Sequence, residues 1–313
     1  MAGGTMTVIE TSPEQTRARY PDQEGYVSRD GVRVFYEVYG SGHPTILLLP
    51  TWSIIHSRHW KAQIPYLARH ARVIAFDGRG NGRSDRPTTE EAYREHEFAA
   101  DALAVLDATG TERAVIVGLS AGALWGALLA AEHPERVEAA AFIAAAAPFA
   151  MHAVRTTAPF DEPMETYEGW DKYNRHYWLE HYRDFLEFFF RQVFTEPHST
   201  KQIEDCVGWG METDGATLAL TYLGRELRDG DAFRELCGRI ACPVLVIHGT
   251  DDAVRPFIVA EELAEVTGGE LAALEGSGHC PHARAPVRVN LLLRDFVAPR
   301  RPARWIRGRG RRK

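Results

Sequence analysis

Short apolar runs alternate with helix-like spacings of apolar residues along most of the chain. Such alternation predicts a mostly parallel sheet covered by helices on both faces. Before it, residues 26–39 indicate two strands joined at Asp30-Gly31, a common hairpin turn. The strands expected after this hairpin are 45–49, 72–76, 114–117, 137–144, 244–248 and 270–274, and the expected helices are 58–69, 90–108, 121–131, 256–266 and 286–297.

The alternation stops in the second half of the chain, where aromatic residues gather. Residues 160–190 are a tenth of the chain and hold a third of its aromatic residues. Trp178, Tyr182 and two later phenylalanines recur at helical spacing, so they share one face of a helix. We expect a helical insertion that packs on the main body, with a few of these side chains, Trp178 and Tyr182 among them, lining an apolar substrate pocket.

The composition is that of a globular protein, with 45% hydrophobic and 25% charged residues among 313. The net charge is −7, yet residues 300–313 carry eight basic residues and no acidic one. The rest of the chain is therefore strongly acidic, which argues against a nucleic-acid-binding domain, since its basic patch should lie on the fold itself. Such a tail is typical of a solvated terminus or a linker, and contact with RNA, anionic lipid or a partner stays open.

Signals for compartment and membrane are weak. The four cysteines match neither a disulfide framework nor a zinc pattern, so a reduced, cytoplasmic setting fits. The N-terminus lacks the basic and apolar regions of a signal peptide. Residues 114–131 are uncharged and near the length of a transmembrane helix, but their glycines fit a tight turn between a buried strand and a buried helix. We expect no membrane span.

The strongest chemical signal is the GxSxG motif at residues 118–122, directly after a predicted buried strand. A serine on a sharp strand-to-helix turn has a strained backbone and an exposed hydroxyl. That hydroxyl becomes a nucleophile only when a base removes its proton. His279 and Asp252 follow the last two predicted strands, so both should lie at the same sheet edge as Ser120, with Asp251 as the alternative acid.

These motifs resemble those of the α/β-hydrolase superfamily, in the esterase-like group with one helical cap. The resemblance covers about residues 26–298 and rests on four signals. It implies an α/β-hydrolase fold, with an eight-stranded, mostly parallel sheet, helices on both faces and a helical cap insertion. The four signals are GLSAG at 118–122, DGRGNGRS at 77–84, HGTDD at 248–252 and GSGH at 276–279.

The resemblance also implies residue roles. Family members place the triad acid three residues after the glycine that closes its strand, which is Asp252 here. The backbone N–H groups of Trp52 and Ala121 would form the oxyanion hole. The chain departs from the family at this point, because Pro50-Thr51 precede Trp52 where His-Gly is common. Haloalkane dehalogenases and epoxide hydrolases of this superfamily have an aspartate at the position of Ser120, so the serine here disfavours those reactions.

Other candidate residues have local explanations. Five further histidines are explained by packing or solvent exposure at least as well as by a role in a site. A metal site around His279 lacks a second well-spaced histidine, so we expect neither a metal nor an organic cofactor. The resemblance implies that Asp77 and the glycines of 77–84 are chiefly structural. The five histidines are His56, His59, His176, His181 and His282.

We therefore expect a cytoplasmic serine hydrolase that cleaves a carboxylic ester or related acyl bond through an acyl-enzyme. Its partner would be a small, apolar or aromatic substrate, and the sequence does not indicate an oligomeric state. Cofactor-free perhydrolysis or hydrolytic C–C cleavage on the same triad, and a receptor-like binding module with little turnover, stay open. The expected parts are an N-terminal extension at 1–25, a core at 26–147 and 237–298, a cap at 148–236 and a basic tail at 299–313.

Overall fold

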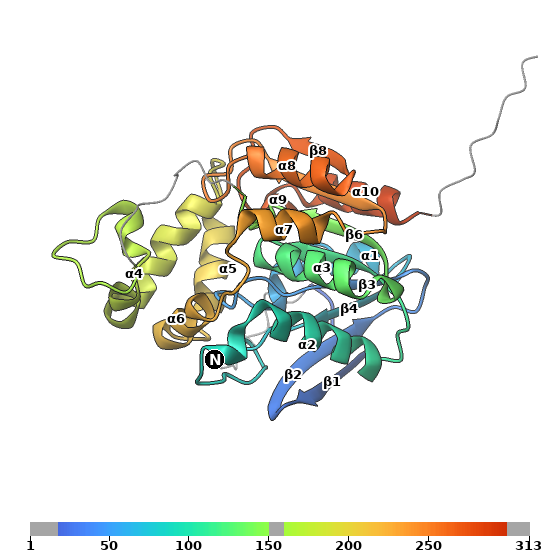
Figure 1. The fold of residues 1–313 in the computed structure, drawn as a ribbon, viewed down its shortest axis with the longest axis horizontal. Helices are drawn as coiled ribbons and strands as arrows, with labels where there is room; N and C mark the ends of the chain where they lie inside the picture. The colour runs from blue at the N-terminus through green and yellow to red at the C-terminus, as the bar shows by residue number, and fades with distance from the viewer. Residues whose placement is uncertain (1–17, 150–159, 299–313) are drawn as a thin grey trace, which may run out of the picture.

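The computed structural model describes residues 18–149 and 160–298, and its central feature is one eight-stranded sheet (Figure 1). Most of the predicted N-terminal extension and the whole basic tail lie outside the described residues. The strands are β1 (Gln23–Arg29), β2 (Val32–Tyr39), β3 (Thr45–Leu48), β4 (Arg72–Phe76), β5 (Ala114–Leu119), β6 (Val137–Ile143), β7 (Val244–Gly249) and β8 (Glu270–Leu274). Their order across the sheet is β1-β2-β4-β3-β5-β6-β7-β8.

The sheet combines an antiparallel hairpin at one edge with a larger parallel part that is buried on both faces. The β1–β2 hairpin is antiparallel, and β2 joins β4 antiparallel, whereas all neighbours from β4 to β8 are parallel. β3, β5 and β7 are buried along their whole length, as expected for parallel strands covered on both faces. The predicted eight-stranded, mostly parallel sheet is confirmed.

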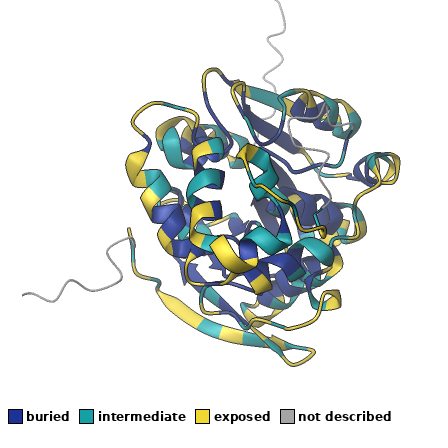
Figure 2. Cartoon of the chain, turned by 90° about the vertical axis from the view of Figure 1, so that its left-hand side faces the viewer, coloured by how far each residue is buried: buried dark blue, intermediate teal, exposed yellow. Residues whose placement is uncertain are grey.

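Helices cover both faces of the sheet and create two apolar cores. Successive strand side chains point to opposite faces, so Ile46 packs in one core and Leu47 in the other. Buried residues gather between the sheet and the helices (Figure 2). One core includes residues of α2 (Glu95–Ala108), α3 (Ala121–Glu132), α7 (Gly230–Cys237) and α8 (Ile258–Thr267), and the other includes residues of α1 (Ile64–Leu67) and α10 (Pro286–Val297), which follows α9 (Pro281–Arg284).

Three helices between β6 and β7 form a separate layer beside the sheet, seen at the left of Figure 1. They are α4 (Arg175–Val193), α5 (Thr200–Gly210) and α6 (Gly215–Leu223), and α4 packs on both of the others. The Asn174 side chain begins α4, because it accepts hydrogen bonds from two N–H groups of the first turn. α7 lies within the range expected for the cap but packs on α3 and α8. The division into core and cap at 148 and 236 stays a prediction.

Two predicted helices are shorter than expected. In place of a helix at 58–69, a 3-10 turn at Ser57–Trp60 precedes the short α1. Pro65 lies in the first turn of α1, where its missing N–H is tolerated, whereas a helix running through it would lose a hydrogen bond. The helix expected from residue 90 begins at Glu95, because Arg94 has an extended backbone.

Candidate active site

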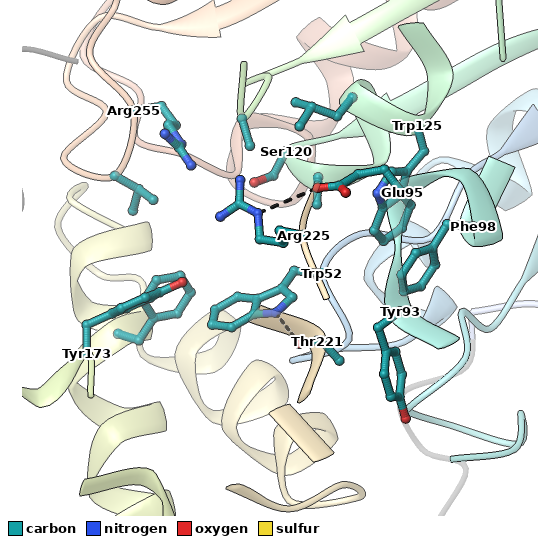
Figure 3. Close-up of a pocket in the computed structure, with 15 residues that line it drawn as sticks. Trp52, Tyr93, Glu95, Phe98, Ser120, Trp125, Tyr173, Thr221, Arg225 and Arg255 are labelled. Atoms are coloured by element: carbon teal, nitrogen blue, oxygen red, sulfur yellow. Dashed lines mark hydrogen bonds and ion pairs between the residues drawn. The ribbon is translucent and has the colours of Figure 1, made fainter. Parts of the chain in front are cut away.

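Ser120 lies on the sharp turn between β5 and α3. Its φ of 52° and ψ of −113° fall outside the regions that ordinary side chains favour. The surrounding backbone holds this conformation: Ser120 N–H donates to the Ile143 carbonyl at 2.9 Å, and the Ser120 carbonyl accepts from Ala123 and Ala146 at 3.1 Å each. The strained turn directs the serine side chain into a cavity beyond the sheet edge (Figure 3).

The two glycines of the motif are required by close backbone contacts. A Cβ atom at Gly118 would lie 2.3 Å from the Gly122 carbonyl oxygen. A Cβ atom at Gly122 would lie 2.1 Å from the carbonyl oxygen of Pro50. Both distances are far shorter than a van der Waals contact, so no larger residue fits without moving backbone. The GxSxG pattern is therefore the sequence consequence of this tight strand-turn-helix packing.

Asp252 and His279 are joined at the same edge of the sheet. The Nδ1 atom of His279 lies 2.7 Å from Oδ2 of Asp252, and both side chains are buried. The backbone of His279 is also held in place, since its main-chain N–H donates a hydrogen bond to the Val193 carbonyl at the end of α4. Asp251, the alternative acid, is exposed and accepts a hydrogen bond from Thr250. The geometry thus pairs the imidazole with Asp252.

The environment of Asp252 keeps its carboxyl group ionised. Burial by itself would raise its pKa, but the charge of His279 and hydrogen bonds from His248 and His279 outweigh it, so the pKa lies well below its usual range. The Oδ1 atom accepts the N–H groups of Val254 and Arg255 at 2.8 Å each. An ionised carboxylate only accepts hydrogen bonds, so Nδ1 of His279 carries the proton and Nε2 is left as the basic atom.

Ser120 and His279 come from loops at the same end of the sheet, after β5 and β8. Across residues 18–149 and 160–298, no hydrogen bond joins the Ser120 hydroxyl to the imidazole. Hydrogen bonds between catalytic groups are often long in enzymes without substrate and tighten when it binds. The arrangement therefore brings acid and base into direct contact and sets the serine at the same edge.

The two predicted oxyanion donors are backbone N–H groups of residues that line the cavity. Trp52 and Ala121 both line it, and neither N–H donates a hydrogen bond within the described parts of the chain. Ala121 is the first residue of α3, so its N–H lies at the positive end of that helix. The unusual Thr51 anchors the preceding loop, because its hydroxyl donates to the Leu119 carbonyl at 2.9 Å. The threonine thus fixes the segment that carries the Trp52 N–H.

The cavity next to Ser120 is mostly apolar (Figure 3). The indole N–H of Trp52 donates to Thr221 at 2.7 Å, which fixes the ring across one wall. Phe98 and Trp125 stack with ring centroids 3.8 Å apart in another wall. A mostly apolar lining with a few polar groups is typical of a site for a small organic molecule. Its remaining lining residues are Tyr93, Glu95, Ala121, Leu124, Ala146, Tyr173, Phe189, Arg225, Val254 and Arg255.

Trp178 and Tyr182, the predicted substrate contacts, do not line this cavity. Trp178 is buried behind it, where its ring packs 5.7 Å from that of Trp52, and Tyr182 donates to the Gly210 carbonyl. The backbone of His181 leaves the helical conformation, so the spacing of an uninterrupted helix does not hold across it. Phe189 of the same aromatic series does line the cavity.

The other histidines lie outside this cavity. His59 and His282 are buried and share a hydrogen bond at 3.1 Å, and His56 packs on Trp209. His176 bonds the carbonyl of Asp161, and His181 is exposed. Within the described residues, no cluster of three or more His, Cys, Asp or Glu side chains is arranged to hold a metal ion.

The loop at 77–84 has the structural role that the resemblance implies. Asp77 accepts hydrogen bonds from the N–H and hydroxyl of Ser57 and from the N–H of Arg83. Arg79 is buried and makes a two-point ion pair with Asp101 at 2.7 Å. These contacts hold the loop against the rest of the protein, and they pair the charged groups of Asp77 and Arg79 with protein partners.

Sequence reasoning missed the charged residues of the cavity, Glu95, Arg225 and Arg255. Arg255 had a signal, since it stands three residues after Asp252 at a sheet edge that was already expected to carry the site. Arg225 had none, because it follows a helix whose placement over the cavity depends on the three-dimensional packing.

The sequence matches a model of the alpha/beta hydrolase fold family over residues 44–286, so the chain belongs to this family. It is 28% identical over 279 residues to a bifunctional esterase/perhydrolase of Acinetobacter calcoaceticus, covering 88% of this chain and 98% of the relative. It is 27% identical to a 2-hydroxymuconate semialdehyde hydrolase of a Pseudomonas species, covering 86% and 91%. The crystal structure of a Pseudomonas aeruginosa hydrolase superposes with a TM-score of 0.73 at 25% identity, covering 89% of this chain and 99% of that one.

A separate finding concerns membranes. Across residues 18–149 and 160–298, every helix is too short or too polar to span a bilayer.

Proposed function

We propose that this chain is a serine hydrolase that cleaves a carboxylic ester or related acyl bond of a small substrate. The observation that carries the proposal is the contact between Asp252 and His279 at the sheet edge where the strained Ser120 faces a cavity. A carboxylate, an imidazole and a hydroxyl in this order are the parts of a catalytic triad. The membership in a hydrolase family supports the same reading.

In the first step, His279 Nε2 takes the proton of Ser120 while the serine oxygen attacks the carbonyl carbon of the substrate. Asp252 holds the imidazole and stabilises its positive form. The carbonyl oxygen becomes an oxyanion and accepts hydrogen bonds from the N–H groups of Trp52 and Ala121. Such donors typically contribute about 10²–10³ each to the rate.

In the second step, His279 passes its proton to the leaving alcohol and an acyl-serine remains. Water, deprotonated by the same imidazole, attacks the acyl carbon and releases the acid and the free serine. The apolar walls around Ser120 favour an apolar or aromatic portion of the substrate and limit the access of bulk water.

Perhydrolysis is a second candidate, favoured by the 28% identical relative named as a bifunctional esterase/perhydrolase. Hydrogen peroxide would replace water in the attack on the acyl-serine, which releases a peroxy acid in place of the acid. Identification of the product formed from an ester in the presence of peroxide separates the two outcomes, because only perhydrolysis forms a peroxy acid.

The state of the four cysteines supports a reducing compartment. All four are free thiols, three of them buried. Reduced cysteines are typical of the cytoplasm, so we propose a cytoplasmic protein. Fractionation of the native host tests this, and recovery from the medium or from a membrane fraction would contradict it.

The proposal is tested by turnover of a neutral 4-nitrophenyl ester by two aspartate variants. Asp252→Asn is expected to lower kcat by about 10⁴, as replacement of a triad aspartate does elsewhere. Asp251→Asn, its exposed neighbour, is the matched control and should retain nearly full activity. Equal losses, or wild-type turnover limited to one event per molecule, would contradict a cycling hydrolase and favour a receptor-like module.

A further inference from the structure

Two arginines enter the cavity beside Ser120 from different parts of the fold. Arg225 follows α6, and Arg255 lies in the loop that carries Asp252. Figure 3 shows the guanidinium group of Arg225 between Ser120 and Trp52, and the Arg255 side chain directed into the same space. A substrate held at the serine would therefore lie next to positive charge.

The arginines are not required by the chemistry proposed for the site. The nucleophile, base, acid and both oxyanion donors are provided by other residues. The other lining residues, apart from Glu95 and a few hydroxyl groups, are apolar. Placing a guanidinium group against aromatic and aliphatic walls is costly unless a partner compensates its charge. For Arg225, whose side chain is 24% exposed, the acidic partner within the described chain is Glu95.

Glu95 compensates Arg225 only in part. Its Oε1 atom lies 3.7 Å from Nε of Arg225, which is an ion pair without a hydrogen bond. Its Oε2 atom accepts the N–H groups of Glu226 at 2.7 Å and Leu227 at 3.4 Å. Glu95 thus fixes the loop that carries Arg225 and holds the guanidinium by Nε. Across the described chain, the Arg225 side chain donates no hydrogen bond.

Among the described residues that line the cavity, Arg225, Arg255 and Glu95 are charged. The nearby carboxylate of Asp252 is already engaged by His279, His248 and two backbone N–H groups. The two terminal nitrogens of a guanidinium group form a planar fork that matches a carboxylate at two points. A ligand carboxylate is the group that best completes this arrangement.

We infer that the substrate carries a carboxylate in addition to its scissile acyl bond, and that Arg225 binds this carboxylate, with Arg255 adding positive charge in the same cavity. The inference rests on the proposed function and narrows its substrate class to acidic esters or lactones, such as half-esters of dicarboxylic acids. The aromatic walls would then contact the carbon chain between the two carboxyl carbons.

The test compares substrates that differ only in charge. On the acyl side, ethyl hydrogen adipate is paired with its neutral amide, ethyl 6-amino-6-oxohexanoate. On the alcohol side, 4-carboxyphenyl acetate is paired with 4-carbamoylphenyl acetate. In at least one pair, wild-type kcat/KM should favour the acid by about tenfold to hundredfold, the range for hydrogen bonds to a charged group. The pair that shows the preference identifies the side that Arg225 binds.

Arginine variants assign the preference to a residue. Arg225→Gln should bring the acid-to-amide ratio of kcat/KM close to one, and Arg225→Lys should restore only part of it, because lysine lacks the two-point fork. Arg183→Gln is the control, since Arg183 is exposed on α4 and pairs with Glu187 outside the cavity. An acid-to-amide ratio near one in both wild-type pairs, or an unchanged ratio in Arg225→Gln, would overturn the inference.

A failure of the proposed function gives a different result. In that case, neither the neutral amide substrates nor 4-nitrophenyl acetate would be turned over. The inference is then tested by binding alone, with adipate titrated into Ser120→Ala by calorimetry. Adipate binding that Arg225→Gln weakens by tenfold or more upholds the carboxylate site, and equal or absent binding rejects it.

Discussion

His248 Nε2 lies 3.1 Å from Oδ2 of Asp252, the same carboxylate oxygen that contacts His279. The Nε2 atom also lies 3.0 Å from the Arg255 carbonyl, so it faces two acceptors and must carry the proton. His248 is fully buried at the end of β7. It therefore holds the acid from behind without reaching the cavity, and we treat it as a positioning residue.

Replacement of His248 tests this positioning role. His248→Leu removes one hydrogen bond to a charged carboxylate, so kcat should fall by about tenfold to hundredfold with little change in KM. The same loss should raise the pKa of Asp252, because the His248 hydrogen bond helps to lower it. His248→Gln offers an N–H of similar reach and should restore most of the activity. A leucine variant with normal kcat and a normal acid limb in its pH profile would refute the role.

Close packing at the turn around Ser120 predicts that alanine variants at two different glycines differ in stability. Gly122→Ala forces its Cβ to 2.1 Å from the Pro50 carbonyl, and the displacement should cost about 1–3 kcal/mol of unfolding free energy. Gly208→Ala is the control, since nothing lies within 4 Å of its Cβ position on α5 and alanine favours a helix. Urea unfolding measures both. A destabilised Gly208→Ala with an unaffected Gly122→Ala would argue against the packing described here.

The buried pair of His59 and His282 predicts sensitivity to acid. Burial, with a further contribution from the charge of His279, lowers the pKa of His282 from 6.5 to about 3. The unfolded chain therefore binds more protons between these two values, and the free energy of unfolding should fall as the pH drops through this window.

Histidine variants test whether this buried pair causes the pH dependence of the free energy of unfolding. His282→Gln cannot take up the proton, so its stability should depend less on pH across the window than that of the wild type. His70→Gln, at an exposed position, should keep the full dependence. Urea unfolding at several pH values decides, and parallel curves for wild type and His282→Gln would show that the buried pair does not contribute.

The fold, and the position of the three predicted catalytic residues at one edge of the sheet, could be predicted because they follow from local patterns. Most strands are short apolar runs, and Ser120, Asp252 and His279 lie one, three and five residues after the ends of β5, β7 and β8. Parallel strands bring their carboxyl ends to one edge, so chain order alone implies that these residues gather. The choice between Asp251 and Asp252 could not be derived from the residues alone, and burial of one and exposure of the other now distinguish them.

The cavity lining was much less predictable. The spacing of apolar residues indicated that Trp178 faces inward, but it could not distinguish contact with substrate from contact with other aromatic rings. The non-helical backbone of His181 also interrupts the regular 3.6-residue spacing of α4. Arg225 reaches the cavity because of where the layer of α4, α5 and α6 lies in the folded protein, a long-range arrangement that no local sequence pattern indicates. Specificity, which depends on such contacts, was accordingly the part that sequence reasoning missed.

The central claim is that Ser120 is the nucleophile, and covalent labelling tests it most directly. A fluorophosphonate probe should modify the wild-type protein once, at Ser120 by peptide mapping, because an activated serine attacks its phosphorus. Ser120→Ala should take up no label and lose ester turnover while keeping the wild-type thermal midpoint. Labelling of another residue, or ester turnover by Ser120→Ala equal to that of the wild type, would contradict the account.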